Sequence, residues 1–235
     1  MKKAVTLATL MLTLLGSKTS AIAEELSLTP YKAIYSNEMD VGISFTGEAT
    51  RELKQLADGT WQLSIEASAM FASVREVSQF TVEEDFLKPL KYDYQRRVMG
   101  KRREASLSFD WENESVTTDI ENQPWRMTIT PGVQDKLSYQ LQMRMDLAAG
   151  KEELIYEVAD GGKLQEYRFR VIGEEVIDTP LGQLKSIKVE RDRGEGSNRE
   201  TYIWFAPELD YMVIRIHQVE TDGKNYLLFL KSLEQ

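Results

Sequence analysis

The amino-acid sequence predicts a mainly β protein, with about a dozen antiparallel strands in a curved sheet, half-barrel or barrel and one amphipathic helix. Apolar residues alternate with polar ones over most of the chain, and turn-forming residues interrupt this alternation at short intervals. A helical spacing of apolar residues is clear in one segment only. Because the twist of strands disfavours a flat sheet of this size, we expect the sheet to curl into a barrel, a half-barrel or two packed sheets.

The N-terminal segment has the three parts of an export signal. Lys2 and Lys3 precede an apolar run, residues 4–15, and the small-any-small pattern of a cleavage site follows at residues 21–23. We therefore expect residues 1–23 to be a cleaved signal peptide and residues 24–235 to be a single β-rich domain in the periplasm. A run of this length is shorter than the roughly 20 residues that cross a bilayer, so we expect no transmembrane segment after processing.

Charge and cysteine content limit the classes of function. The 235 residues carry 29 Lys and Arg and 38 Asp and Glu, and removal of residues 1–23 takes away three of the basic residues and no acidic one. The remaining net charge of −12 repels nucleic acid, which we exclude as a partner. The chain has no cysteine, so the core must stabilise the fold without disulfides.

The first well-defined hairpin is predicted in the N-terminal third. Residues 61–67 alternate strictly, with Trp61, Leu63 and Ile65 on one face, and residues 41–49 alternate in the same way. Asp58 and Gly59 between them provide the positive-φ turn chemistry of a hairpin.

Further strands are expected between breaks in the alternation. We interpret Lys88-Pro89 and Gln123-Pro124 as two of these breaks. The expected strands are residues 76–84, 92–99, 104–111, 115–120, 125–130, 153–159, 162–172, 183–191, 200–205, 212–220 and 226–233.

The one helix is expected within residues 131–150. Apolar residues recur there at spacings of three and four, and Gly150 is a suitable stop. We expect the apolar stripe to plug the open end or the concave face of the sheet. Leu141 should then face the sheet, whereas Gln142 should tolerate substitution by Asp. The stripe consists of Val133, Leu137, Leu141, Met145 and Ala148.

No catalytic, metal-binding or cofactor-binding motif is found, so we expect no catalytic residue, no metal and no cofactor. His217 is the only histidine and has no serine or cysteine motif beside it, which excludes histidine-based catalysis. The acidic doublets, such as Glu83-Glu84, point to opposite faces of a strand and cannot form a hydrolase pair by themselves. A pair that forms across strands stays open as an alternative.

A basic segment is the one local departure from the acidic composition. Five of eight residues between 96 and 103 are basic, with Gly100 at an expected hairpin tip. Guanidinium groups bind phosphate and carboxylate bidentately, so the segment is our candidate ligand-binding site; the alternative is ordinary solvated surface that neutralises nearby acids. The candidate residues are Arg96, Arg97, Lys101, Arg102 and Arg103.

Aromatic residues form the second candidate feature. They suit the lining of an apolar cavity, although core packing of the strands would use the same residues. They are Tyr92, Tyr94, Phe109, Trp111, Trp125, Tyr202 and Trp204.

Four short motifs together resemble a bacterial secreted family, Domain of Unknown Function 3108. The resemblance extends from Tyr31 to about Leu230, with one departure at Met212-Val213, where such proteins commonly carry a proline. It implies an exported single domain rich in antiparallel strands and supplies no established activity. The motifs are Phe109-Asp110-Trp111, Gln134-Asp135-Lys136-Leu137-Ser138, Thr179-Pro180-Leu181-Gly182 and the run from Tyr202 to Tyr211.

From these observations we expect a non-enzymatic periplasmic domain that binds an apolar or amphipathic, lipid-like envelope component, or a protein partner. The partner classes are a lipid, a glycan or an envelope protein. A carboxylate-based hydrolase of envelope glycans is one alternative, and a ligand-free assembly or scaffold protein is another. A cavity would favour binding over the scaffold.

Overall fold

The computed structural model describes residues 26–40, 44–70, 72–83 and 86–235. The expected signal peptide therefore lies outside the described residues. Among those residues, no helix is long and apolar enough to span a membrane. The strands are β1 (Tyr31–Asp40), β2 (Ser44–Gln55), β3 (Trp61–Ala69), β4 (Ala72–Glu83), β5 (Phe86–Val98), β6 (Lys101–Asp110), β7 (Ser115–Ile120), β8 (Gln123–Thr128), β9 (Glu153–Asp160), β10 (Lys163–Thr179), β11 (Gly182–Asp192), β12 (Glu200–Ala206), β13 (Met212–Val219) and β14 (Asn225–Glu234).

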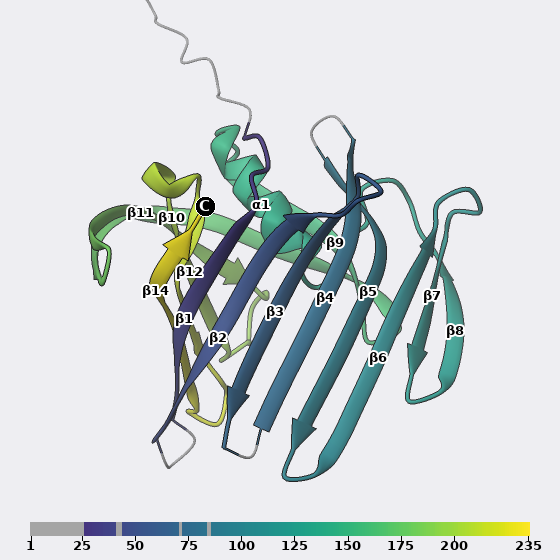
Figure 1. Cartoon of the computed structure of the whole chain (residues 1–235), viewed down its shortest axis with the longest axis horizontal. Helices are drawn as coiled ribbons and strands as arrows, with labels where there is room; N and C mark the ends of the chain where they lie inside the picture. Colours follow the sequence, from purple (N-terminus) through teal and green to yellow (C-terminus); the bar gives the residue numbers. More distant parts are fainter. Residues whose placement is uncertain (1–25, 41–43, 71, 84–85) are drawn as a thin grey trace, which may run out of the picture.

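All described strands belong to one antiparallel sheet, in the order β8-β7-β6-β5-β4-β3-β2-β1-β14-β13-β12-β11-β10-β9. Two meanders, β1 to β8 and β9 to β14, are joined where β1 pairs with β14. The sheet is curved and does not close, so β8 and β9 are its two ends (Figure 1). The helix α1 (Ser138–Ala148) lies in the chain between these two ends and contacts both β5 and β9. The predicted fold class is confirmed.

The predicted turn chemistry explains the β2–β3 hairpin. Gly59 adopts a φ of +85°, and the Asp58 carboxylate accepts hydrogen bonds from the backbone N–H and the hydroxyl of Thr60. Leu53 pairs with Leu63 across the hairpin, and both are fully buried. The predicted inward face is therefore correct.

Two predicted breaks are wrong, because both prolines lie inside strands. Pro89 is in β5, next to a register shift between β4 and β5, and such an irregularity removes the need for its missing N–H. Pro124 is in β8, an end strand with a ladder partner on one side only. The strand β1, at the centre of the sheet, was not among the predicted strands.

The helix separates two apolar clusters. Leu137 and Leu141 belong to the larger cluster, which the first meander dominates. Met143 and Leu147 belong to the smaller one, formed with the second meander. The prediction of a single apolar stripe is therefore incomplete, because α1 is buried on two sides.

Polar residues of α1 are buried as well, and hydrogen bonds fix them to distant strands. The Arg51 guanidinium donates to the Tyr31 hydroxyl at 3.1 Å and to the Gln140 side-chain oxygen at 2.8 Å. The Arg144 guanidinium donates to the Asp210 carbonyl at 2.9 Å and lies over the Tyr31 ring. These contacts hold the helix between β1, β2 and the turn before β13.

Gln142 contradicts the expectation of a tolerant position, because it is 5% exposed. Its side-chain oxygen accepts the Leu87 N–H at 2.7 Å, and its amide donates to Asp146 at 3.2 Å. The Asp146 carboxylate also accepts the Tyr156 hydroxyl at 2.7 Å. This face of α1 is therefore a buried polar contact and not a solvated surface.

A tryptophan connects the two ends of the sheet. The Trp125 indole N–H of β8 donates to the Gly162 carbonyl in the β9–β10 turn at 2.8 Å. A Cβ atom on Gly162 would lie 1.5 Å from the nearest indole carbon, so only glycine fits beneath this ring. The chain after β8 adds a second connection, since Gln134 forms a parallel bridge with Val158 of β9.

We expect Gly162→Ala to displace the Trp125 indole from the turn. Gly161→Ala is a matched control, because Gly161 also has positive φ but has open space at its Cβ position. Both variants should lose about 1 kcal/mol of stability through backbone strain, and only Gly162→Ala should lose about 1 to 2 kcal/mol more with the indole contact. Urea unfolding and acrylamide quenching of tryptophan fluorescence measure this difference. Equal stability and quenching in the two variants would show that Trp125 is not held on the turn.

Candidate functional site

The predicted basic segment forms the tip of the β5–β6 hairpin. Arg96 pairs with Arg103 and Arg97 with Arg102 across the hairpin, and Lys101 pairs with Val98 beside the turn. Because side chains alternate along a strand, Arg96 and Arg103 share the inner face with buried Tyr92, whereas Arg97 and Arg102 belong to the outer face. The five basic residues, which the sequence analysis treats as one candidate site, are therefore divided between two faces.

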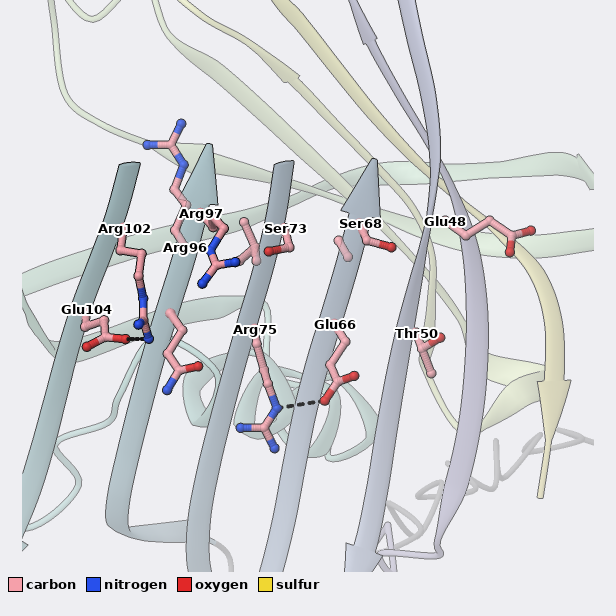
Figure 2. A pocket seen from close by; sticks show the side chains of 13 residues that line it. Glu48, Thr50, Glu66, Ser68, Ser73, Arg75, Arg96, Arg97, Arg102 and Glu104 are labelled. Carbon is pink, nitrogen blue, oxygen red and sulfur yellow. Dashed lines mark hydrogen bonds and ion pairs between the residues drawn. The ribbon is translucent and has the colours of Figure 1, made fainter. Parts of the chain in front are cut away.

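The outer face carries a polar hollow of about 480 Å³ across β2 to β6 (Figure 2). Two neighbouring ladder rows supply most of its wall. The first row consists of Glu48, Ser68, Ser73, Arg97 and Arg102, and the second of Thr50, Glu66, Arg75, Gln95 and Glu104.

Most charges of this outer hollow are already paired. The Arg75 guanidinium lies 2.8 Å from Glu66, and that of Arg102 lies 2.5 Å from Glu104. Arg97 has no ion pair among the described residues. Arg96 also borders this hollow and likewise has no ion pair among the described residues. The outer hollow thus offers a mainly neutralised polar surface with two unpaired guanidinium groups.

A second hollow, of about 290 Å³, lies on the inner face, and its exposed lining is more apolar. Inward residues of β5, β6 and β7 form one wall, and the end of β9 with the β9–β10 turn forms the other. We call it the inner pocket. It is lined by Tyr92, Tyr94, Arg103, Glu104, Ala105, Leu107, Thr118, Ile120, Lys136, Ala159, Asp160 and Gly161.

Two cationic groups border the inner pocket. The Lys136 ammonium lies 3.5 Å from the Asp160 carboxylate and 5.9 Å from the centre of the Tyr94 ring. The Arg103 guanidinium is 70% exposed and lies 3.9 Å from Glu121, a weak contact at such exposure. Arg103 is therefore available to an anionic group at the pocket border, where Lys136 is shared with Asp160.

Two residues with hydroxyl groups line the pocket, and they differ in their hydrogen bonding. The Thr118 hydroxyl is buried and has no hydrogen-bond partner among the described residues, so it is an unsatisfied donor in the pocket wall. The Tyr92 hydroxyl donates to the Glu76 carboxylate at 2.5 Å. Burial, reinforced by the Glu76 charge, raises the pKa of Tyr92 above its ordinary value, so this phenol is neutral.

The most perturbed carboxyl group does not open to either hollow. Burial raises the pKa of Asp135 to about 6, and its oxygens accept hydrogen bonds from Ser78, Leu137 and Ser138. Its role is to fix the start of α1. Within the described part of the chain, no group of three or more His, Cys, Asp or Glu residues is arranged to hold a metal ion. His217 contacts the Asn225 side chain at 3.2 Å.

Sequence reasoning found part of the inner pocket. Arg103, Tyr92 and Tyr94 were named as candidates, while Arg96, Arg97, Lys101 and Arg102 lie outside it. Lys136 and Thr118 were missed as site residues, because Lys136 reaches the pocket only through the connection from β8 to α1. The resemblance motif around Gln134-Asp135-Lys136 was the one available signal for that segment.

Comparisons with known proteins identify relatives without an assigned activity. A family described as "Protein of unknown function (DUF3108)" matches residues 31–229. No curated protein matches the chain. A solved structure of the beta-barrel-like protein of domain of unknown function DUF1849 from Brucella abortus is similar, with a TM-score of 0.61 and 11% identity over 89% of this chain and 98% of that chain. At this identity, the similarity shows a shared fold.

Proposed function

The chain belongs to the DUF3108 family of proteins of unknown function, and on the basis of its inner pocket we propose that it binds an amphipathic, anionic, lipid-like molecule without catalysing a reaction. The apolar part of the molecule would lie against Leu107, Ile120 and Tyr94, and its anionic group would meet Arg103 and Lys136. The proposed location is the periplasm, after removal of residues 1–23.

The observation that carries the proposal is the combination of chemistries in one pocket. Apolar side chains line the wall, two cations border it, and the buried Thr118 hydroxyl has no partner in the part of the chain that the structure describes. Ligand pockets commonly have this character, with apolar walls and a few polar groups that fix orientation. The outer hollow lacks the apolar wall and is therefore a poorer fit for a lipid-like molecule.

The apolar wall and the limited volume of the pocket predict how the affinity depends on the chain length of the ligand. Each methylene group transferred from water contributes about 0.8 kcal/mol, which is about fourfold in the dissociation constant. For a series of saturated fatty acids, we expect the affinity to rise about fourfold per methylene and then to level off when the pocket is filled. Isothermal titration calorimetry below the critical micelle concentration measures this series.

Two variants separate the apolar and the anionic contributions. Arg103→Gln should weaken binding of a fatty acid about tenfold and leave binding of its methyl ester unchanged, because only the acid carries a charge. Ala105→Trp should weaken binding of both by filling the pocket. Arg126→Gln, an exposed substitution on β8, is the matched control. Fatty-acid affinity that depends neither on chain length nor on Ala105 would refute the proposed function.

A further inference from the structure

Two methionines are exposed to an unusual degree, and both are at hairpin ends. Met70 is 88% exposed at the end of the β3–β4 hairpin, and Met99 is 83% exposed in the β5–β6 turn. The next most exposed large apolar side chain among the described residues is Val176, at 58%. The two hairpins are neighbours, because Ala72 of β4 pairs with Val98 of β5. The β3–β4 and β5–β6 hairpin ends therefore lie at the same end of the first meander (Figure 1).

The basic segment lies in the β5–β6 hairpin, next to Met99. Arg97, Lys101 and Arg102 lie within three residues of Met99 in the sequence, and Arg97 and Arg102 belong to the outer face (Figure 2). Arg96 and Arg103 belong to the inner face of the same hairpin. The chain as a whole is acidic, so this end has a charge opposite to that of the molecule.

The division of the arginines between two faces distinguishes two kinds of anionic partner. A small anion is bound by guanidinium groups that converge on one point, and the five basic residues cannot all converge because they are divided between two faces. A bilayer surface instead surrounds an inserted hairpin tip on all sides, so that basic residues on both faces meet lipid phosphates. Long basic side chains reach the head groups while the apolar tip lies deeper.

We propose that the ends of the β3–β4 and β5–β6 hairpins form a docking surface for an anionic phospholipid bilayer, with Met70 and Met99 entering the interface. Methionine suits this position, because its flexible, polarisable side chain adapts to an irregular environment. Arg97, Lys101 and Arg102 supply the electrostatic attraction. Docking does not require the inner pocket to be loaded, so this proposal is separate from the proposed function.

The test is cosedimentation with lipid vesicles. The protein is purified in the form that the cell accumulates, with its N-terminus determined by mass spectrometry. The vesicles are either phosphatidylcholine alone or phosphatidylcholine with a quarter of phosphatidylglycerol. We expect partition into the anionic vesicles only, weakened strongly between 50 and 500 mM NaCl, as screening of surface charges requires.

Two combined variants and a matched control identify the contacts. Arg97→Gln, Lys101→Gln and Arg102→Gln together should lower the partition coefficient about a hundredfold at low salt, at about fivefold per charge. Met70→Ser with Met99→Ser should lower it about tenfold. Val176→Ser with Arg168→Gln, both exposed on β10, should leave it unchanged. Partition that is equal in the methionine variant and the wild type would overturn the proposal.

A tryptophan at the hairpin tip reports insertion into the bilayer through its fluorescence. Met99→Trp should show a blue-shifted emission on addition of anionic vesicles and quenching by brominated lipid, whereas Val176→Trp should show neither. Wild-type binding to soluble glycerol phosphate with no binding to vesicles would assign the basic residues to a small anion and refute docking. Partition that is equal in neutral and anionic vesicles would likewise refute the electrostatic part.

Discussion

Replacing Leu141 by Asp is expected to lower the free energy of unfolding by several kcal/mol or to prevent folding. Leu141 is fully buried in the larger apolar cluster, where α1 faces the first meander. A carboxylate there replaces an apolar side chain of the core and must lose its hydration, which is among the most costly changes a core admits. Urea unfolding followed by circular dichroism measures the loss. Glu152→Gln, exposed just after the helix, is the control and should stay within about 0.5 kcal/mol of wild type.

The same experiment should show a large effect at Gln142, where sequence reasoning expected tolerance. Gln142→Asp places a second carboxylate beside Asp146 and removes the amide that donates to it. The shorter side chain also withdraws the oxygen that accepts the Leu87 N–H. We expect a loss of about 2 to 4 kcal/mol from the unpaired buried groups. Stability equal to that of Glu152→Gln would mean that this side of α1 faces solvent.

Gln142 shows which part of the fold the sequence can predict and which part it cannot. Strands were predicted well because a half-buried strand shows its environment in its own alternation, as Leu63 and Ile65 do. A buried polar residue produces no such pattern in the local sequence, since its hydrogen-bond partners come from elsewhere in the chain. Arg144, for example, donates to the carbonyl of Asp210, 66 residues away.

The strand β1 was missed for a related reason. Tyr31, Ala33 and Tyr35 share its buried face, so the alternation is present. The difference in hydrophobicity between the two faces of β1 is small, however, because alanine is small and tyrosine is partly polar. The Tyr35 hydroxyl is buried only because it donates to the carbonyl of Val213 at 2.8 Å, and the sequence does not show this contact. The pairing of β1 with β14 depends on the same long-range closure.

The candidate site was predicted by composition but not by geometry. Clustered basic residues are visible in any sequence, and alternation predicts that Arg96 and Arg97 point to opposite faces. Which face is concave depends on the curvature of the whole sheet. The inner pocket depends further on Asp160 and Gly161, whose turn reaches β5 to β7 only because the sheet curls until its ends approach.

Asp135 fixes the start of α1 through its hydrogen bonds. Its Oδ1 atom accepts the N–H groups of Leu137 and Ser138 at 2.7 and 2.9 Å, and its own N–H donates to the Ser138 hydroxyl at 2.8 Å. The Ser78 hydroxyl donates to Oδ2 at 2.5 Å. This reciprocal arrangement resembles a capping box and satisfies backbone donors that would otherwise be buried without partners. Asp135→Ala should therefore cost about 2 kcal/mol or more over the whole pH range.

The charge of Asp135 acts in the opposite direction. Burial raises its pKa from 3.8 to about 6, so the folded protein holds this proton more tightly than the unfolded chain does. The resulting contribution to stability is complete below about pH 4 and is lost as the pH rises through 6, a change of about 3 kcal/mol.

Asp135→Asn isolates this effect, because its side-chain oxygen still accepts the two N–H groups and its amide donates to Ser78. Relative to wild type, we expect the free energy of unfolding of the variant to rise by about 3 kcal/mol between pH 4 and pH 8. Urea unfolding of both proteins at each pH measures the difference and cancels the titration of the other acidic groups. A difference that is independent of pH would show that Asp135 titrates normally and that its carboxyl group is hydrated in the folded protein.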